Sequence, residues 1–253
     1  MREGINIMHQ PIFLSNLQGE YQDEYGNVIY GDCLNCKIYI HGDNNFLDFR
    51  GADISNTEIS IGNNCSIELG QNVKFMNNRV DLSTAVNSKI KIEDKVECNS
   101  GKIIMFPESK LIIHERTTIW YSFDFVIEFC SECIIGRDSM FSSFVKLDTS
   151  DGHSIFDTAL RKNINSVGEN KYHKVILEEH TWIGKDSFVL GNCHIGAGSI
   201  VGARSLVKGT YPNNCIIAGC MGRVIAKNRS WSREYMAENI SMCGSGHVEL
   251  TKE

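Results

Sequence analysis

The second half of the sequence repeats an aliphatic residue every six positions. The in-phase series is Leu177, Ile183, Val189, Ile195, Val201 and Val207. A small residue stands four positions after most of them, at Thr181, Ser187, Cys193, Ser199 and Ser205. A period of six matches neither the 3.6-residue period of an α-helix nor the alternation of a single strand. It predicts a three-sided coil of short parallel strands, in which the aliphatic side chains point inward and glycine or Asn-Asp turns the corners.

Looser copies of the repeat extend upstream, although their register drifts. They begin at Ile61, Ile92, Ile113 and Ile135. We therefore expect an all-β solenoid over residues 29–225, with about 18 residues per coil and on the order of ten coils. The aromatic content of 9% suits a core column filled by aliphatic and small side chains. An ordinary β-sandwich would instead show a period of two and irregular turn spacing.

The two ends of the chain lack the repeat. Residues 1–28 carry aromatic and acidic side chains, which predicts a cap or an irregular first coil. Residues 226–253 are expected to hold a short helix over 230–239, with Ser230 or Ser232 as its N-cap, and then a frayed tail from Ser241.

Composition excludes several classes of function. A net charge of −6 argues against a nucleic-acid partner. No run of eighteen apolar residues or secretory segment is present, so no membrane span or export is expected. Ten cysteines without a disulfide pattern suit a reducing cytoplasm.

Two Cys-x-x-Cys pairs raise the alternative of a zinc site. Cys33/Cys36 and Cys130/Cys133 lie about a hundred residues apart, unlike a local zinc knuckle. Because Cys65 and Cys193 occupy the small-residue position of the repeat, core packing is favoured and no metal is expected.

The repeat is interrupted between Leu147 and Lys174, which predicts a loop extruded from a corner over about 148–174. Asp151-Gly152-His153 lies inside it, close to Asp148. Histidine exchanges a proton near neutral pH, and a nearby carboxylate can fix its tautomer, so His153 is a candidate general base with Asp151 as a candidate partner. A lone histidine is more often a surface residue, and the other seven lack this context.

Three segments in this region resemble a known family. Residues 180–184 (HTWIG), 195–203 (IGAGSIVGA) and 217–225 (IAGCMGRVI) are similar to the C-terminal signature of hexapeptide-repeat acetyltransferases, such as galactoside, maltose, serine and capsule-polysaccharide O-acetyltransferases. The specific part of the match covers about residues 130–230. The resemblance implies a left-handed parallel β-helix, a homotrimer, and acetyl-CoA bound in a groove between neighbouring subunits.

The resemblance also implies roles for individual residues. His153 matches the family's catalytic histidine and would act as the general base, with no acyl-enzyme. Trp182 matches a residue at the CoA channel, although corner packing is an alternative for it. The positions that match the CoA contacts are Lys185, Ala203, Lys208, Gly209, Arg223 and Lys227. The sequence departs from the family at Lys208-Gly209, which replaces Thr-Lys, at Cys220-Met221-Gly222, which replaces Asn-Pro-Ala, and at Lys227, one position late. These departures put individual phosphate contacts in doubt.

The function expected from the resemblance is O-acetylation of a sugar hydroxyl in a bacterial surface polysaccharide, such as capsule or O-antigen, or its precursor. The alternative is N-acetylation of an amino-sugar nucleotide. A non-catalytic scaffold is a third hypothesis, and a zinc carbonic anhydrase is disfavoured by the missing histidine spacing. Trp120 and Tyr121 would stack on a glycan if they face outward, and would be core packing if they do not.

Overall fold

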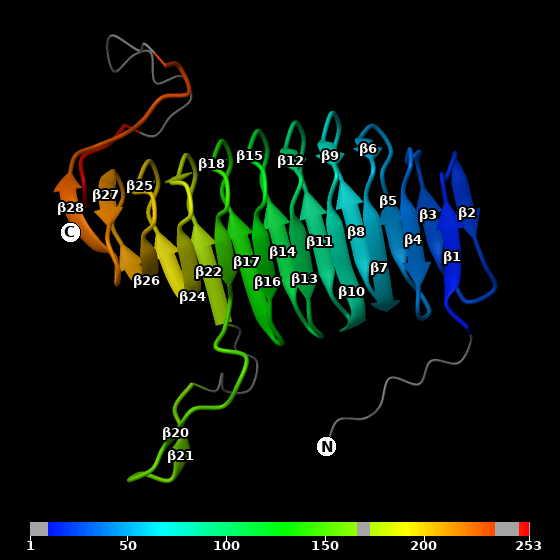
Figure 1. The fold of residues 1–253 in the computed structure, drawn as a ribbon, viewed down its shortest axis with the longest axis horizontal. Helices are drawn as coiled ribbons and strands as arrows, with labels where there is room; N and C mark the ends of the chain where they lie inside the picture. Colours follow the sequence, from blue (N-terminus) through cyan, green and yellow to red (C-terminus); the bar gives the residue numbers. More distant parts are fainter. Residues whose placement is uncertain (1–9, 166–172, 236–247, 253) are drawn as a thin grey trace.

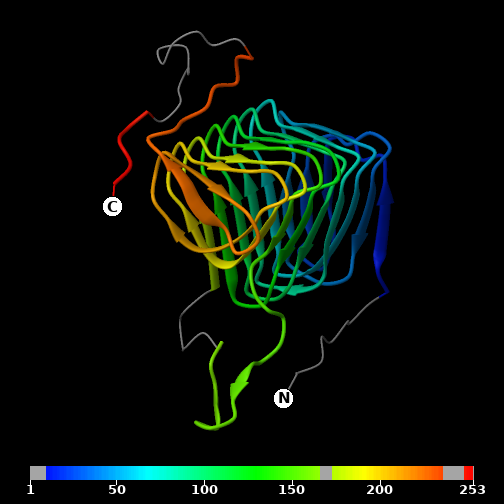
Figure 2. The same cartoon turned by 60° about the vertical axis from the view of Figure 1, so that its left-hand side comes forward.

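The computed structural model describes residues 10–165, 173–235 and 248–252. Over these ranges the chain forms strands, turns and bends and no α-helix. Figure 1 shows the strands stacked as the coils of a long solenoid, and Figure 2 shows the three-sided cross-section. The predicted all-β, left-handed parallel β-helix is therefore confirmed. No helix in the described ranges has the length and apolar character to cross a bilayer.

Three parallel faces form the solenoid. The first face contains β3 (Val28–Tyr30), β5 (Phe46–Asp48), β8 (Ser66–Leu69), β11 (Lys89–Ile92), β14 (Lys110–Ile113), β17 (Ser131–Ile135) and β22 (His173–Leu177). The second face contains β4 (Lys37–Ile40), β7 (Glu58–Asn63), β10 (Arg79–Val86), β13 (Lys102–Met105), β16 (Asp124–Ile127) and β19 (Lys146–Asp148). The long strands β24 (Phe188–Ile195) and β26 (Leu206–Tyr211) turn the corner between these two faces.

The third face is a separate sheet with eight parallel strands, one from each complete coil of the described residues. These are β6 (Asp53–Ser55), β9 (Lys74–Met76), β12 (Glu97–Asn99), β15 (Thr118–Ile119), β18 (Met140–Phe141), β23 (Trp182–Ile183), β25 (Ile200–Val201) and β27 (Cys215–Ala218). The expectation of about ten coils is therefore wrong. Val189 lies one coil from Val207, a spacing of 18 residues, but Val80 lies one coil from Ile103, a spacing of 23. Longer N-terminal coils also explain why the upstream register drifts.

The aliphatic side chains of the repeat form the core. Each strand alternates buried and partly exposed positions, and the buried residues stack coil upon coil, as Phe141, Ile183, Val201 and Ile217 do on the third face. Full burial of one such side chain contributes about 1.5–3 kcal/mol. The small residues fill the corners, where Ser139 Oγ lies 3.0 Å from Thr181 Oγ1 of the next coil. The inward set predicted from the hexads is the observed one.

Antiparallel strands cover both ends of the coil. At the N-terminal end β1 (Ile12–Ser15) pairs with β4, and β2 (Glu20–Gln22) pairs with β3. At the C-terminal end β28 (Arg223–Lys227) folds back on β27. Such pairing satisfies backbone groups that an open coil would leave exposed.

The short C-terminal helix expected over 230–239 is absent from its described part. Residues 230–235 form only bends and a turn, and residues 236–239 lie outside the described residues. The physical reason is tertiary contact, because the side chains of Trp231 and Arg233 are anchored on the third face instead of lying along a free helix.

The cysteines of the two Cys-x-x-Cys pairs belong to the coil. Cys33, Cys36 and Cys133 are buried free thiols, and Cys130 is partly buried at a corner. Among the described residues, no group of three or more histidine, cysteine or acidic side chains is arranged to hold a metal ion.

Candidate active site

A loop leaves the solenoid between β19 and β22 and carries His153. Figure 1 shows it extending away from the coil stack, with the small hairpin of β20 (Phe156–Asp157) and β21 (Lys162–Asn163) at its far end. His153 is exposed and lies where the loop departs from the second face. Gly152 precedes it with φ of 69°, a left-handed conformation that glycine adopts without a Cβ penalty.

One asparagine holds this part of the loop together. Asn165 Nδ2 donates to the His153 carbonyl at 2.8 Å and to Asp151 Oδ2 at 3.1 Å. Its Oδ1 accepts from the Ile155 backbone N–H at 2.8 Å. The returning strand of the loop therefore fixes the backbone on both sides of His153. Sequence reasoning treated Asn165 as part of a featureless polar stretch, and no local motif marks it.

The structure brings Lys208, but not the other expected cationic residues, to the base of this loop. Lys208 lies on β26, two coils beyond β19, and its Nζ lies 3.8 Å from Asp151 Oδ1. Asp151 is thus engaged by Lys208 and Asn165. These contacts position the loop on the coil. Gly209 follows Lys208 with φ of 94° and open space around it.

Two partly buried carboxyl groups lie beneath His153. Burial raises the pKa of Glu128, and the charge of Asp148 raises it further, while His153 acts in the opposite direction. Burial also raises the pKa of Asp148, with smaller contributions from Asp124 and Asp151. A positive imidazolium at His153 therefore finds negative charge close by. Glu128 was missed by sequence reasoning, although the coil spacing of about 22 residues places it below Ser150.

A cavity of about 540 Å³ lies at the corner between the third and second faces. Lys185 and Ala203, two of the expected CoA positions, line it together with Phe144, Lys146 and Arg204. The Lys185 ammonium lies 5.6 Å from the centroid of the Phe144 ring. With Asp186 as the acidic residue of the lining, three cations give this cavity a positive character suited to phosphate groups.

Trp182 lies elsewhere, on the outer side of the third face. Its Nε1 donates to Ser142 Oγ at 3.2 Å, and its ring lies 6.1 Å from that of Trp231. Trp182 is on β23 whereas His153 follows β19 of the second face, so the solenoid body separates them within one chain. Arg223 and Lys227 are exposed on β28 at the C-terminal end.

The expected site residues other than Arg223 and Lys227 therefore fall into three groups. His153, Asp151 and Lys208 meet at the corner where the loop leaves, Lys185 and Ala203 line the cavity at the next corner, and Trp182 lies on the third face. Outward side chains on one face of a parallel coil all point in the same direction. Residues on different faces of one chain therefore do not meet at a common site.

The three-sided coil and its six-residue repeat are features that this chain shares with a known family. Residues 174–209 match the family model for bacterial transferase hexapeptide (six repeats). The chain thus carries the repeat of the bacterial hexapeptide transferases, and the resemblance found in the sequence is confirmed.

Particular relatives are polysialic acid acetyltransferases. The chain is 32% identical over 169 residues to a polysialic acid O-acetyltransferase of Escherichia coli O1:K1 / APEC, which covers 66% of this chain and 50% of that protein. The chain spans about half the length of that relative. The crystal structure of the polySia-specific acetyltransferase NeuO matches with a TM-score of 0.61 and 28% identity, covering 85% of this chain and 89% of that one. The polysialic acid O-acetyltransferase OatWY shares the fold, with a TM-score of 0.70 and 22% identity over 83% of this chain and 94% of that one.

Proposed function

We propose that this chain is an O-acetyltransferase that moves an acetyl group from acetyl-CoA to a sugar hydroxyl of a bacterial surface polysaccharide or its precursor. The observation that carries the proposal is the presentation of His153 at the root of the extruded loop, where Asn165 fixes its backbone and the Glu128 carboxyl group interacts with it. The similarity to a polysialic acid O-acetyltransferase supports the same reaction class.

His153 acts in this proposal as the general base. Its neutral imidazole takes the proton of the acceptor hydroxyl while that oxygen attacks the carbonyl carbon of the acetyl thioester. The tetrahedral intermediate then collapses, the carbon–sulfur bond breaks, and the imidazolium returns the proton to the CoA thiolate. General-base catalysis of this kind contributes about 10²–10⁴ in rate. Glu128 stabilises the imidazolium that forms between the two steps.

The acetyl-CoA site is assigned to the cavity lined by Lys185 and Ala203. Lys185, Lys146 and Arg204 would meet the phosphates of the nucleotide, and exposed backbone groups at the corner would bind the pantetheine amides. Lys208, Gly209, Arg223 and Lys227 remain proposed contacts along the same ligand, as the resemblance implies.

A homotrimer would bring the separated groups together. Because His153, the Lys185 cavity and Trp182 lie on different sides of one prism, a complete site needs a neighbouring copy, with the loop of one subunit reaching the cofactor groove of the next. The extruded loop supports such an interface, because it exposes apolar side chains at Ile155, Phe156, Leu160 and Ile164.

The acceptor is assigned to the glycan class, within the cytoplasm where capsule or lipid-linked precursors are assembled. Trp120 and Tyr121 are about half exposed, at 49% and 52%, whereas Phe123 and Phe125 of the same stretch are buried. The first two offer aromatic faces on which sugar rings stack, and the last two fill the core.

An acceptor panel with isotopically labelled acetyl-CoA tests this proposal. We expect label in polysialic acid or another surface glycan, and a loss of about 10²–10⁴ in kcat for His153→Ala. His114→Ala is the matched control and should keep wild-type activity. His114 lies at another corner, where its Nδ1 is 2.9 Å from Glu93 Oε2. Label only in amino-sugar nucleotides would replace O-acetylation with the N-acetyl alternative. Full acetyl transfer by His153→Ala would remove the proposed base.

A further inference from the structure

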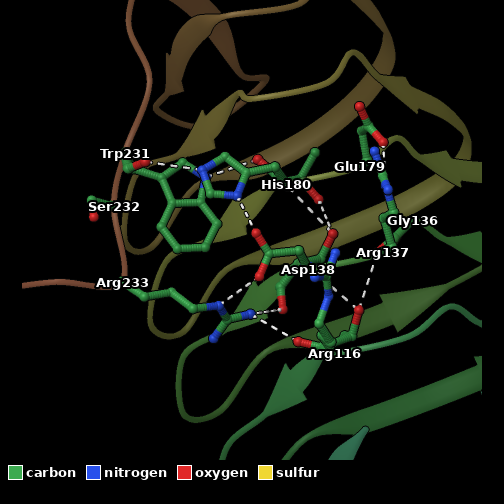
Figure 3. Close-up of polar contacts among 12 residues, drawn as sticks. Arg116, Gly136, Arg137, Asp138, Glu179, His180, Trp231, Ser232 and Arg233 are labelled. Carbon is green, nitrogen blue, oxygen red and sulfur yellow. Dashed lines mark hydrogen bonds and ion pairs between the residues drawn. The ribbon is translucent and has the colours of Figure 1, made fainter. Parts of the chain in front are cut away.

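Residues 230–235, here called the C-terminal strap, leave β28 and run back over the third face. Each successive contact lies on an earlier coil. Trp231 packs on His180, and Arg233 reaches the preceding coils at Asp138 and Arg116, as the close-up in Figure 3 shows. Nothing in the proposed reaction uses this strap, yet it is more densely bonded than the catalytic loop.

Arg233 anchors the far end of the strap with four hydrogen bonds. Its Nε donates to Asp138 Oδ1 at 2.8 Å, and its Nη1 donates to Thr118 Oγ1 at 3.0 Å. Its Nη2 donates to two backbone carbonyls, those of Arg116 at 3.1 Å and Ser139 at 3.0 Å. A planar guanidinium matches such a fan of acceptors in a way that a lysine ammonium does not.

His180 forms the second anchor, and it is buried. Its ring lies flat on the Trp231 indole, with centroids 4.0 Å apart and an angle of 4° between the planes. Its Nδ1 lies 2.8 Å from Asp138 Oδ2, and its Nε2 lies 2.9 Å from the Trp231 carbonyl oxygen. The Trp231 Nε1–H donates in return to the His180 carbonyl at 2.8 Å.

This geometry determines the protonation state of the closed strap. A carbonyl oxygen only accepts hydrogen bonds, and so does an ionised carboxylate, so the two ring nitrogens of His180 must both carry hydrogen. Asp138 stays ionised because Arg233 binds its other oxygen. Burial alone would raise the pKa of Asp138, but the hydrogen bonds and charges of His180 and Arg233 outweigh burial and hold it well below its usual range. The closed strap therefore holds an imidazolium.

The strap also contacts the residue assigned to the CoA channel. Trp231 lies against Trp182 at a tilt of 50°, and Ser142 binds the Trp182 indole N–H. The Trp182 ring is therefore held between a hydroxyl on the neighbouring coil and an indole that only the strap supplies.

We propose that the C-terminal strap positions Trp182, and that a protonated His180 locks the strap onto the third face through Asp138 and Trp231. The positioning role rests on the proposed function and on the family resemblance, which places Trp182 at the CoA channel. Trp231, His180 and Arg233 are positioning residues here, since none of them is assigned to touch the reacting atoms.

The lock responds to pH in a defined direction. Closing the strap retains a ring proton, so alkaline pH removes one of the two His180 hydrogen bonds and favours release. Asp138 and Arg233 face the ring directly, and the described residues of this corner also form the Arg137–Glu179 pair at 2.6 Å and the Arg116–Glu115 pair at 3.6 Å. Both are pairs of opposite charge.

Tryptophan fluorescence of the full chain tests the lock independently of activity. The protonated imidazole stacked on the Trp231 indole quenches its emission, so wild-type fluorescence should rise when the pH is raised and the strap is released. Trp231→Phe and His180→Gln should both lose this transition. A wild-type signal that does not change, or one that survives in His180→Gln, overturns the lock.

Calorimetric titration with CoA tests the positioning role. We expect Arg233→Ala to weaken CoA binding by about tenfold or more at every pH, because loss of one charge-assisted hydrogen bond gives a factor of this size. The wild-type protein should lose CoA affinity by a similar factor only at alkaline pH. Arg229→Ala is the matched control, because among the described residues that exposed side chain donates hydrogen bonds to the neighbouring carbonyls of Lys227 and Asn228 and not to the third face.

The outcomes separate the two proposals. Equal CoA affinity in wild type and Arg233→Ala overturns the positioning role and leaves the acetyltransferase standing. If neither wild type nor Arg229→Ala binds CoA, the proposed function fails together with the positioning role, and the fluorescence titration still decides the lock.

Discussion

Asn165 gives the sharpest test of how the extruded loop presents its histidine. Replacement by alanine removes the two Nδ2 hydrogen bonds, to the His153 carbonyl at 2.8 Å and to Asp151 at 3.1 Å. It also removes the Oδ1 acceptor of the Ile155 N–H, at 2.8 Å. The imidazole itself is untouched, so any loss of rate reflects positioning.

The size of the effect follows from these bonds. Each partly exposed hydrogen bond contributes about 0.5–1.5 kcal/mol net, so loss of the three weakens the ordered loop by about 2–4 kcal/mol. In the wild type, the ordered loop is taken to be favoured over the disordered loop by a similar free energy. The fraction of molecules with an ordered loop then falls in the variant, and the rate drops by about ten- to a hundredfold. Global stability should change by less than about 0.5 kcal/mol, because the loop lies outside the buried column.

The assay compares kcat/KM for acetyl transfer with thermal unfolding of the same samples. Asn165→Asp should be at least as impaired as the alanine variant, since it keeps the acceptor but places a second carboxylate beside Asp151. Asn87→Ala is the control, because Asn87 is an asparagine of another corner whose side chain, within the described part of the chain, donates one hydrogen bond to Glu108. Wild-type kcat/KM in Asn165→Ala, with unchanged proteolytic resistance of the loop, would refute the clamp.

Three further outcomes are expected elsewhere in the molecule. Ile183→Ala should lower the free energy of unfolding by about 2–5 kcal/mol in chemical denaturation, because a fully buried member of the column is truncated. Leu160→Asp, at an exposed site on the loop, should leave the melting temperature of the coil in place and shift the proposed trimer toward smaller species in light scattering. The pKa of Asp138 is lowered in the folded protein, so its contribution to the stability of the closed strap is present above about pH 4 and is lost as the pH falls toward that lower pKa. Asp138→Asn should therefore remove this acid-dependent change from the Trp231 emission.

The sequence by itself determined the coil and its inward residues. A six-residue period leaves little freedom, because only a flat-sided coil places Ile183, Val201 and their equivalents in one buried column. The interruption after Leu147 likewise located the extruded loop and its histidine, since a solenoid accommodates an insertion only at a corner.

Tertiary structure alone decided how residues of different coils meet. The longer N-terminal coils set the number of turns at eight instead of ten, and they stack Glu128 beneath the loop. His180, which the sequence analysis named only as part of the HTWIG segment, joins Asp138 across 42 positions and the carbonyl of Trp231 across 51. The expected C-terminal helix gave way to this strap. A local pattern fixes which way each side chain points, but the partner it meets depends on coil length and on where the chain folds back, which no local pattern contains.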